Sequence, residues 1–175
     1  MPLSKTDIRR LFELLDEELS SAGVIGEIYV VGGAVMCLVH AARPATRDVD
    51  ALLLPAKPLR EAARRVAARA DLPETWLNDA AKGYLSELGD YDAYLELGHL
   101  RVLTAQPAYL LAMKCLAARI GEEFHDLDDI RYLLRHLDIA SYDDALAVIC
   151  RYYPEASFPQ KTFYLLEELL PRASG

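Results

Sequence analysis

Two aspartates separated by one residue, Asp48 and Asp50, are the clearest candidates for chemistry in this sequence. Side chains two residues apart on a strand point to the same face, so an extended segment would hold both carboxylates together. Two like charges this close repel each other unless a cation or a set of donors compensates them. Mg²⁺ commonly binds through one or two carboxylates and substrate phosphates, so the pair predicts a magnesium site. For such a pair alone, a solvated turn or strand end is the more common explanation.

A glycine pair strengthens the metal interpretation. Gly32 and Gly33 follow the apolar segment "EIYVV" and precede a second apolar stretch, "AVMCLVH". Glycine lets the backbone approach a ligand closely, and a helix that starts here would present free N–H groups to an anion. By itself the pair more often marks a tight turn. Together with the Asp-x-Asp segment, it predicts a site for a nucleoside triphosphate and Mg²⁺. Arg43 and Arg47 flank that segment and either neutralise phosphate charge or are solvated loop arginines.

The elements that would position these residues are strands and helices in the first two-thirds of the chain and helices in the last third. Apolar spacing predicts strands at 27–33 and 48–55, two strands within 93–105, and helices at 4–22, 34–43, 59–70 and 74–85. Ser4 and Asp7 have capping-box spacing at the first helix. Further helices are expected at 107–120, 126–137, 142–152 and 160–170.

These elements predict an α+β fold. We expect a small mixed β-sheet core flanked by helices over residues 1–105, and a C-terminal helical region, 106–175, packed on that core as a single compact unit. No internal repeat, low-complexity tract or flexible linker suggests a further division of the chain.

Composition limits the classes of function. The chain of 175 residues is 53% apolar and has a formal charge of −8. No apolar run approaches the roughly 18 residues that span a bilayer, and the N-terminal segment has no apolar signal-peptide core, so we expect a cytoplasmic protein with no membrane partner. The acidic balance argues against an extended nucleic-acid coat. One basic strip is the exception, and either follows a nucleic-acid backbone or is a solvated helix face: Arg60, Arg64, Arg65 and Arg69.

Several segments, taken in order, resemble a known superfamily. "VGGAV" followed by "TRDVDALL" resembles the signature of the DNA polymerase β-type nucleotidyltransferases, in which a glycine turn precedes an Asp-x-Asp strand. "AYLLAMKCLAAR" (108–119) and "HDLDDIRYLL" (125–134) resemble later motifs of the AbiEii and MenT-type toxin nucleotidyltransferases. "TWLNDAAKGYL" (75–85) resembles a block of small bacterial members of this group. The matches span residues 30 to 134.

The resemblance implies roles for particular residues. Asp48 and Asp50 would be metal ligands and catalytic residues, and Lys114 would reach the triphosphate. A further carboxylate near the site would come from the helix that follows. The catalytic set implied is Asp48, Asp50, Lys114, Asp126 and Asp129. The nucleotide-binding set is Gly32, Gly33, Arg47, Asn78 and Lys82.

Structural explanations compete with these roles. Lys114 lies among leucines, so it either extends its charge out of a core-facing helix or points into a cleft. Asp126 and Asp129 share one face at a helix start, where the helix dipole also favours aspartate. Asn78 and Lys82 are expected four residues apart on one helix face, where they line the cleft or make an ordinary surface contact.

Two positions depart from the family pattern. His125 stands where the family usually has Arg or Lys, and the third strand carboxylate has no clear match, with Glu96 in "YLELG" as the best local candidate. Without a third carboxylate, a one-metal mechanism or a catalytically degenerate member is expected.

The function implied is a Mg²⁺-dependent nucleotidyltransferase, in which an acceptor hydroxyl attacks the α-phosphate of a nucleoside triphosphate and pyrophosphate leaves. The likeness to MenT-type toxins implies the 3′ end of tRNA as acceptor, a role as the toxin of a toxin–antitoxin pair, and a cognate antitoxin as partner. Two alternatives stay open: an antitoxin-like minimal nucleotidyltransferase that adenylylates a protein, and a non-catalytic nucleotide-binding scaffold.

Overall fold

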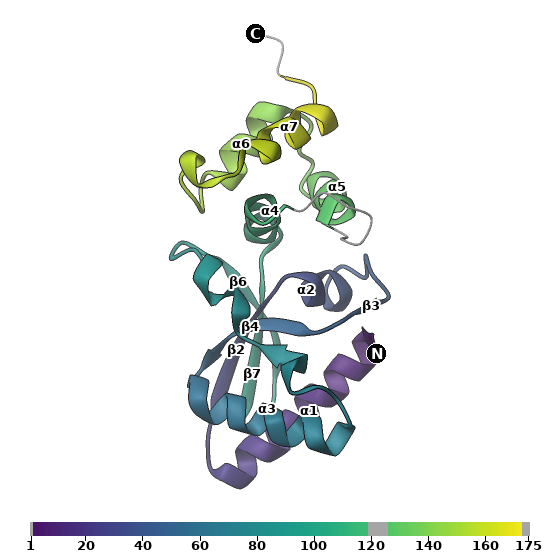
Figure 1. Ribbon diagram of the computed structural model, residues 1–175, viewed down its shortest axis with the longest axis vertical. Coiled ribbons are helices and arrows are strands. Elements are labelled where there is room, and N and C mark those ends of the chain that lie inside the picture. Colours follow the sequence, from purple (N-terminus) through teal and green to yellow (C-terminus); the bar gives the residue numbers. More distant parts are fainter. Residues whose placement is uncertain (1, 119–125, 173–175) are drawn as a thin grey trace. The chain divides into compact units, whose positions relative to one another are not determined.

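The computed structural model describes residues 2–118 and 126–172, and it divides into two compact units. The first unit comprises Met1–Gly83 and Tyr91–Ala105, and the second comprises Tyr84–Asp90 and Gln106–Gly175. The first holds the mixed sheet and the second is helical, so the predicted α+β class with C-terminal helices is confirmed (Figure 1). The assignment of Tyr84–Asp90 to the second unit was not expected.

The first unit is built on a five-stranded sheet with the strand order β5-β4-β2-β7-β6. Its strands are β2 (Gly26–Val31), β4 (Val49–Leu54), β5 (Leu77–Asn78), β6 (Tyr91–Glu96) and β7 (Leu100–Ala105). Strand β2 pairs antiparallel with β4 and parallel with β7, and β6 and β7 form an antiparallel pair. A second, short sheet joins β1 (Leu3–Ser4) and β3 (Ala45–Thr46).

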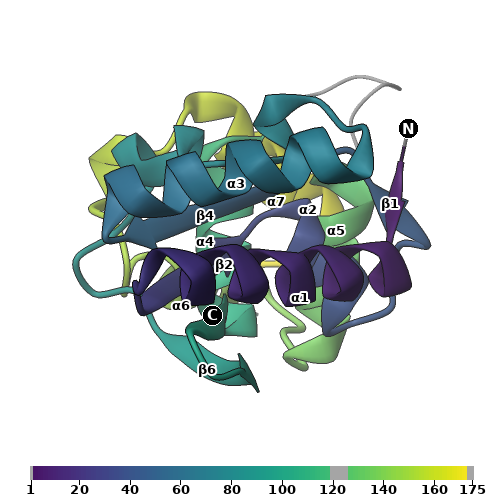
Figure 2. The same ribbon diagram turned by 90° about the horizontal axis from the view of Figure 1, so that it is seen from below.

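Two helices, α1 (Lys5–Ala22) and α3 (Ala56–Ala70), lie side by side over one face of the five-stranded sheet (Figure 2). The predicted capping box of α1 is present, because the side chains of Ser4 and Asp7 each accept a hydrogen bond from the other's backbone N–H. A third helix, α2 (Gly33–Leu38), is shorter than the predicted 34–43. Ala41 adopts a positive φ of 51°, which is incompatible with a helix continuing to residue 43.

The neighbours of Gly26 identify the face of the sheet that α1 and α3 cover. A Cβ atom on Gly26 would lie 3.0 Å from Leu59 of α3 and 3.2 Å from Leu19 of α1. Because side chains alternate along a strand, Ile28 and Val30 point to the same side, where both are fully buried. The opposite side is called the distal face below. Strand pairing assigns to it Tyr29 and Val31 of β2, Asp50 and Leu52 of β4, Asn78 of β5 and Leu103 of β7.

The helix predicted for residues 74–85 is wrong. The segment forms a 3₁₀ turn (Glu74–Trp76), then β5, then a second 3₁₀ turn (Ala80–Tyr84). Trp76 is buried, and its Nε1 donates a hydrogen bond to the carbonyl of Ala63 in α3 at 2.9 Å. This anchor places the next two residues at the edge of the sheet, so Asn78 pairs with Asp50 of β4.

The described part of the second unit contains the helices α4 (Pro107–Leu116), α5 (Asp126–His136), α6 (Tyr142–Ile149) and α7 (Gln160–Leu169). Two tyrosines fasten the segment Tyr84–Asp90 to these helices. The buried hydroxyl of Tyr109 accepts a hydrogen bond from the backbone N–H of Ser86 at 2.9 Å, and the Tyr152 hydroxyl donates to Asp90 at 2.8 Å. These bonds explain why the segment belongs to the helical unit.

Across the residues that the structure describes, no helix combines the length and the apolar character that a membrane span requires.

Tyr152→Phe is expected to lower the free energy of unfolding by about 1.5–3 kcal/mol, because it removes a hydrogen bond to a charged group while the ring remains. Burial and, after it, the Asp90 bond raise the pKa of Tyr152 to about 12. This stabilisation is therefore complete below pH 10, the ordinary tyrosine pKa, and is lost as the pH rises through 12. Urea unfolding followed by circular dichroism at pH 7 measures the effect.

The control is Tyr164→Phe, because the Tyr164 side chain is 60% exposed on α7. Its unfolding midpoint should match that of the unmodified chain. An equal loss in both variants would contradict a specific role for the Tyr152–Asp90 bond.

Candidate functional site

Strand pairing brings the Asp-x-Asp segment to the glycine turn. Asp50 is paired with Val31, the last residue of β2, and Gly32 follows directly. A Cβ atom on Gly32 would lie 3.4 Å from Oδ2 of Asp50. Two motifs that are separated in the sequence therefore meet at one end of the sheet.

The backbone requires a glycine at position 32, and the glycine at position 33 allows two side chains to approach closely. Gly32 adopts φ 71° and ψ −149°, a conformation that is strained for residues with a side chain. A Cβ atom on Gly33 would lie 2.7 Å from Nη1 of Arg43 and 3.1 Å from Oγ1 of Thr46. The Arg43 guanidinium and the Thr46 hydroxyl thus lie in the space that a side chain at position 33 would occupy.

Of the two arginines predicted to neutralise phosphate charge, Arg43 is the one that lies against the glycine turn. Arg47 is exposed, and its charge acts on Asp48. A guanidinium group suits bidentate contact with phosphate oxygens, so Arg43 is the better placed of the two for a triphosphate at Gly33. Both arginines flank the Asp-x-Asp segment in the sequence, and only the folded turn distinguishes them.

Asp48 lies one residue before β4 and is half-buried. Burial raises its pKa above the ordinary value, and the charge of Arg47 and a hydrogen bond from Asn78 oppose this rise without cancelling it. Ionisation of Asp48 therefore costs more in the folded protein than in water. A divalent cation beside Asp48 and Asp50 would offset that cost.

Asn78 lies on the distal face next to Asp50, because the two are paired between β5 and β4. Its Nδ2 donates to the carbonyl of Thr75 at 3.1 Å, and its Oδ1 accepts from the N–H of Ala80 at 3.2 Å. These bonds fix the amide beside the carboxylates. The helical pairing predicted between Asn78 and Lys82 is wrong, because the segment is not a helix. Lys82 has an exposed side chain.

Glu96, the candidate for a third carboxylate, lies away from the site. It pairs with Arg101 of β7, whose partner on β2 is Glu27. Glu27 is four residues before Val31, the partner of Asp50, which corresponds to about 13 Å along the strands. The suggestion that Glu96 completes the site is therefore wrong.

The donor set fits a cation with few protein ligands. Within residues 2–118 and 126–172, no group of three or more His, Cys, Asp or Glu side chains gathers as a metal site. Asp48 and Asp50 offer two carboxylates at one end of the sheet, beside the turn at Gly32 and Gly33. Mg²⁺ suits this arrangement, because it retains water and substrate oxygens among its ligands.

Lys114, Asp126 and Asp129 form a cluster of their own in the second unit. The Nζ atom of Lys114 lies 3.0 Å from Oδ1 of Asp126 and 2.8 Å from Oδ2 of Asp129. The lysine and Asp129 side chains are only 11% and 3% exposed. The ion pairs tie α4 to the start of α5, so the aspartates do more than favour the helix dipole. That these residues act together with Asp48 and Asp50 stays a prediction, and His125 lies outside the described residues.

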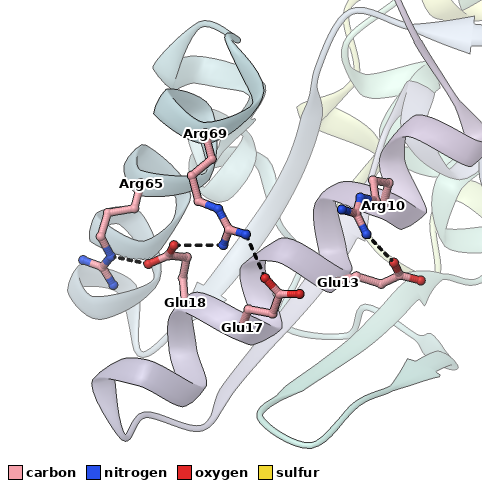
Figure 3. Close-up of polar contacts among 6 residues, drawn as sticks. All are labelled: Arg10, Glu13, Glu17, Glu18, Arg65 and Arg69. Atoms are coloured by element: carbon pink, nitrogen blue, oxygen red, sulfur yellow. Dashed lines mark hydrogen bonds and ion pairs between the residues drawn. The ribbon is translucent and has the colours of Figure 1, made fainter.

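The basic strip on α3 is not available as a set of free cations. Figure 3 shows Arg65 and Arg69 directed toward Glu17 and Glu18 of α1, with atom separations of 2.8–3.0 Å. Each strip arginine has a carboxylate partner: Arg60 with Asp79, Arg64 with Glu74, Arg65 with Glu18, and Arg69 with Glu17 and Glu18. This pattern favours the alternative of a solvated helix face over a nucleic-acid track.

No protein-family model matches this chain, and no curated protein or solved structure matches it at a significant level.

Asp48→Asn is expected to stabilise the metal-free protein at pH 7. Because burial raises the folded-state pKa of Asp48, ionisation opposes folding. That cost is absent below the unfolded pKa near 4 and develops as the pH rises through the folded-state value. The advantage of asparagine should shrink as the pH falls from 7 toward 4. Urea unfolding in EDTA measures it.

Asp71→Asn is the matched control, because Asp71 is exposed at the end of α3. The difference in urea midpoint between Asp71→Asn and the unmodified chain should stay the same as the pH falls from 7 toward 4. A loss of stability for Asp48→Asn at pH 7 would contradict the argument.

Lys114→Met is expected to lower the free energy of unfolding by about 3–5 kcal/mol, because it breaks both ion pairs of the cluster, one of them to the buried Asp129. Lys161→Met, an exposed position on α7, should change stability by less than about 0.5 kcal/mol. Adding Asp129→Asn to Lys114→Met should restore part of the loss. If Lys114→Met costs no more than the control, the cluster does not stabilise the helical unit.

Proposed function

We propose that this chain is a Mg²⁺-dependent nucleotidyltransferase, which transfers a nucleoside monophosphate from a nucleoside triphosphate to an acceptor hydroxyl. The observation that carries the proposal is the pairing of Asp50 with Val31, which sets the carboxylates beside the turn at Gly32 and Gly33. Arg43 at the same turn supplies a cation suited to phosphate. The resemblance of these segments to the polymerase β-type nucleotidyltransferases supports the same chemistry.

In the proposed reaction, the acceptor oxygen attacks the α-phosphorus while the bond from that phosphorus to the bridging oxygen of the β-phosphate breaks. Pyrophosphate leaves, and the acceptor proton passes to water or a carboxylate. Asp48 and Asp50 would hold Mg²⁺, which when bound polarises phosphate oxygens. The backbone at Gly33 would admit the triphosphate, and Arg43 would contact its oxygens and stabilise the charge that develops on the leaving group.

Lys114 would contribute a second cation to triphosphate binding, as the resemblance implies. Asp126 is the more exposed of its two partners, at 19% against 3% for Asp129. Asp129 is therefore the more enclosed of the two carboxylates that hold the lysine within the helical unit.

For the acceptor we propose the 3′ end of tRNA, with the chain acting as the toxin of a toxin–antitoxin pair, on the basis of the MenT-type resemblance. The α3 arginines do not supply the basic surface that RNA requires, since each is paired with a carboxylate. The RNA contact must then come from other cations. Transfer to a protein hydroxyl and nucleotide binding without transfer are the alternatives that the experiment must separate.

Asp50→Asn is expected to lower nucleotide transfer at least about 100-fold, because the reacting phosphate loses charge stabilisation. The chain is incubated with Mg²⁺, total RNA and each nucleoside triphosphate labelled at the α-phosphate, and products are separated by electrophoresis. Label should move to tRNA with the unmodified chain. Asp71→Asn, an exposed Asp-to-Asn change, should transfer label at the unmodified rate.

The other outcomes identify the alternatives. Label on protein would favour the adenylylating enzyme. Mg²⁺-dependent binding of a non-hydrolysable triphosphate without transfer would favour the scaffold. Absence of both binding and transfer would overturn the proposed function.

A further inference from the structure

The distal face carries an aromatic surface next to Asp50. Tyr29 of β2 pairs with Leu52 of β4, two residues along the strands from the pairing of Val31 with Asp50. Tyr29 and Asp50 are therefore diagonal neighbours on the same face, a relation in which residue positions are about 7–8 Å apart. An aromatic residue thus lies next to a proposed metal ligand on the sheet.

A second ring extends this surface. Tyr91 of β6 meets Tyr29 edge to face, with the ring centroids 5.0 Å apart and the planes at 76°. Leu103 of the intervening strand β7 pairs with Tyr29 and lies beneath this contact. Leu52, Tyr29, Leu103 and Tyr91 are called the aromatic row below.

The Tyr29 ring is held in place by polar contacts at its far end. Its hydroxyl donates to Oε1 of Glu27 at 2.9 Å, and Oε2 of Glu27 pairs with Arg101 at 3.2 Å. Tyr29, Tyr91 and Leu52 nevertheless retain partial exposure. A ligand that packs on Tyr29 would therefore meet a ring that is already oriented, which reduces the entropy lost on binding.

We infer that the aromatic row is a nucleobase-binding subsite, an inference that rests on the proposed function. A ligand that uses both this row and the adjoining site must join a flat, apolar ring to a phosphate. A nucleotide has that construction, and aromatic side chains stack on any base because every base has a π-face. The base belongs either to the bound triphosphate or to the acceptor nucleotide beside the reacting phosphate.

The test compares ligands with and without a base. Isothermal titration of the full chain in Mg²⁺ uses the α,β-methylene analogue of ATP, inorganic tripolyphosphate, and a short single-stranded oligoribonucleotide. Tyr29→Leu, which keeps an apolar contact, should weaken either the analogue or the oligonucleotide by about 5- to 100-fold. It should leave tripolyphosphate unchanged, and Tyr29→Phe, which keeps the ring and loses only the hydroxyl bond to Glu27, should weaken the base-bearing ligand less than Tyr29→Leu does.

The pattern of losses assigns the source of the base. A loss for the ATP analogue places the base of the triphosphate on the row, and a loss for the oligonucleotide places the acceptor base there. Tyr164→Leu, a change at an exposed tyrosine of α7, should affect no ligand. Thermal unfolding of each variant checks that the fold is retained.

Failure of this inference is distinguishable from failure of the proposed function. If the unmodified chain binds tripolyphosphate with Mg²⁺ and Tyr29→Leu changes neither base-bearing ligand, the subsite is overturned and the transferase proposal stands. If tripolyphosphate and the ATP analogue both fail to bind, both proposals are overturned.

Discussion

The antiparallel pairing of β2 with β4 is the constraint on which the candidate site depends. The register that pairs Val31 with Asp50 also pairs Val30 with Ala51, and that second pair is buried on the face covered by α1 and α3. A slip of one residue would exchange the faces, burying the Asp50 carboxylate and exposing Val49. Core packing therefore holds the register, and the register holds the carboxylate at the glycine turn.

The features that the sequence predicts well are those that depend on near neighbours. The capping box at Ser4, the strand after Asp48 and the turn at Gly32 each follow from residues a few positions apart. That the strand after Asp48 and the turn at Gly32 meet at one site is harder to predict, because the prediction requires the order of the strands in the sheet as well as the strands themselves.

The failures have a common cause in contacts between distant segments. Residues 74–85 contain good helix formers, but Trp76 bonds to α3 and Asn78 joins the edge of the sheet. The choice of Arg43 over Arg47 likewise depends on the path of the loop around Gly33. The partners of Arg69 lie on α1, which is remote in the sequence. Local periodicity cannot predict such pairings, and tertiary contacts override helix propensity where the two conflict.

Two groups of cations differ in their surroundings, the arginines paired on α3 and the cations near candidate site residues. The chain has a formal charge of −8, and the arginines of α3 are engaged by carboxylates, several of them on the neighbouring helix. Arg43 instead lies against a glycine turn beside Asp50, and Lys114 lies between two aspartates in a largely buried cluster. A carboxyl whose pKa is raised by burial, as at Asp48, is typical of functional sites.

The alternation of the sheet also explains why charge and an aromatic surface occur together. In a sheet with one face covered by helices, the other face is expected to be polar. The distal face instead combines Asp50 and Asn78 with Tyr29 and Leu52, because positions of the same parity on paired strands share a face. Apolar rings at such positions add nothing to the core beneath α1 and α3. A ligand with a flat ring and a charged end would cover both these side chains and the two carboxylates beside them.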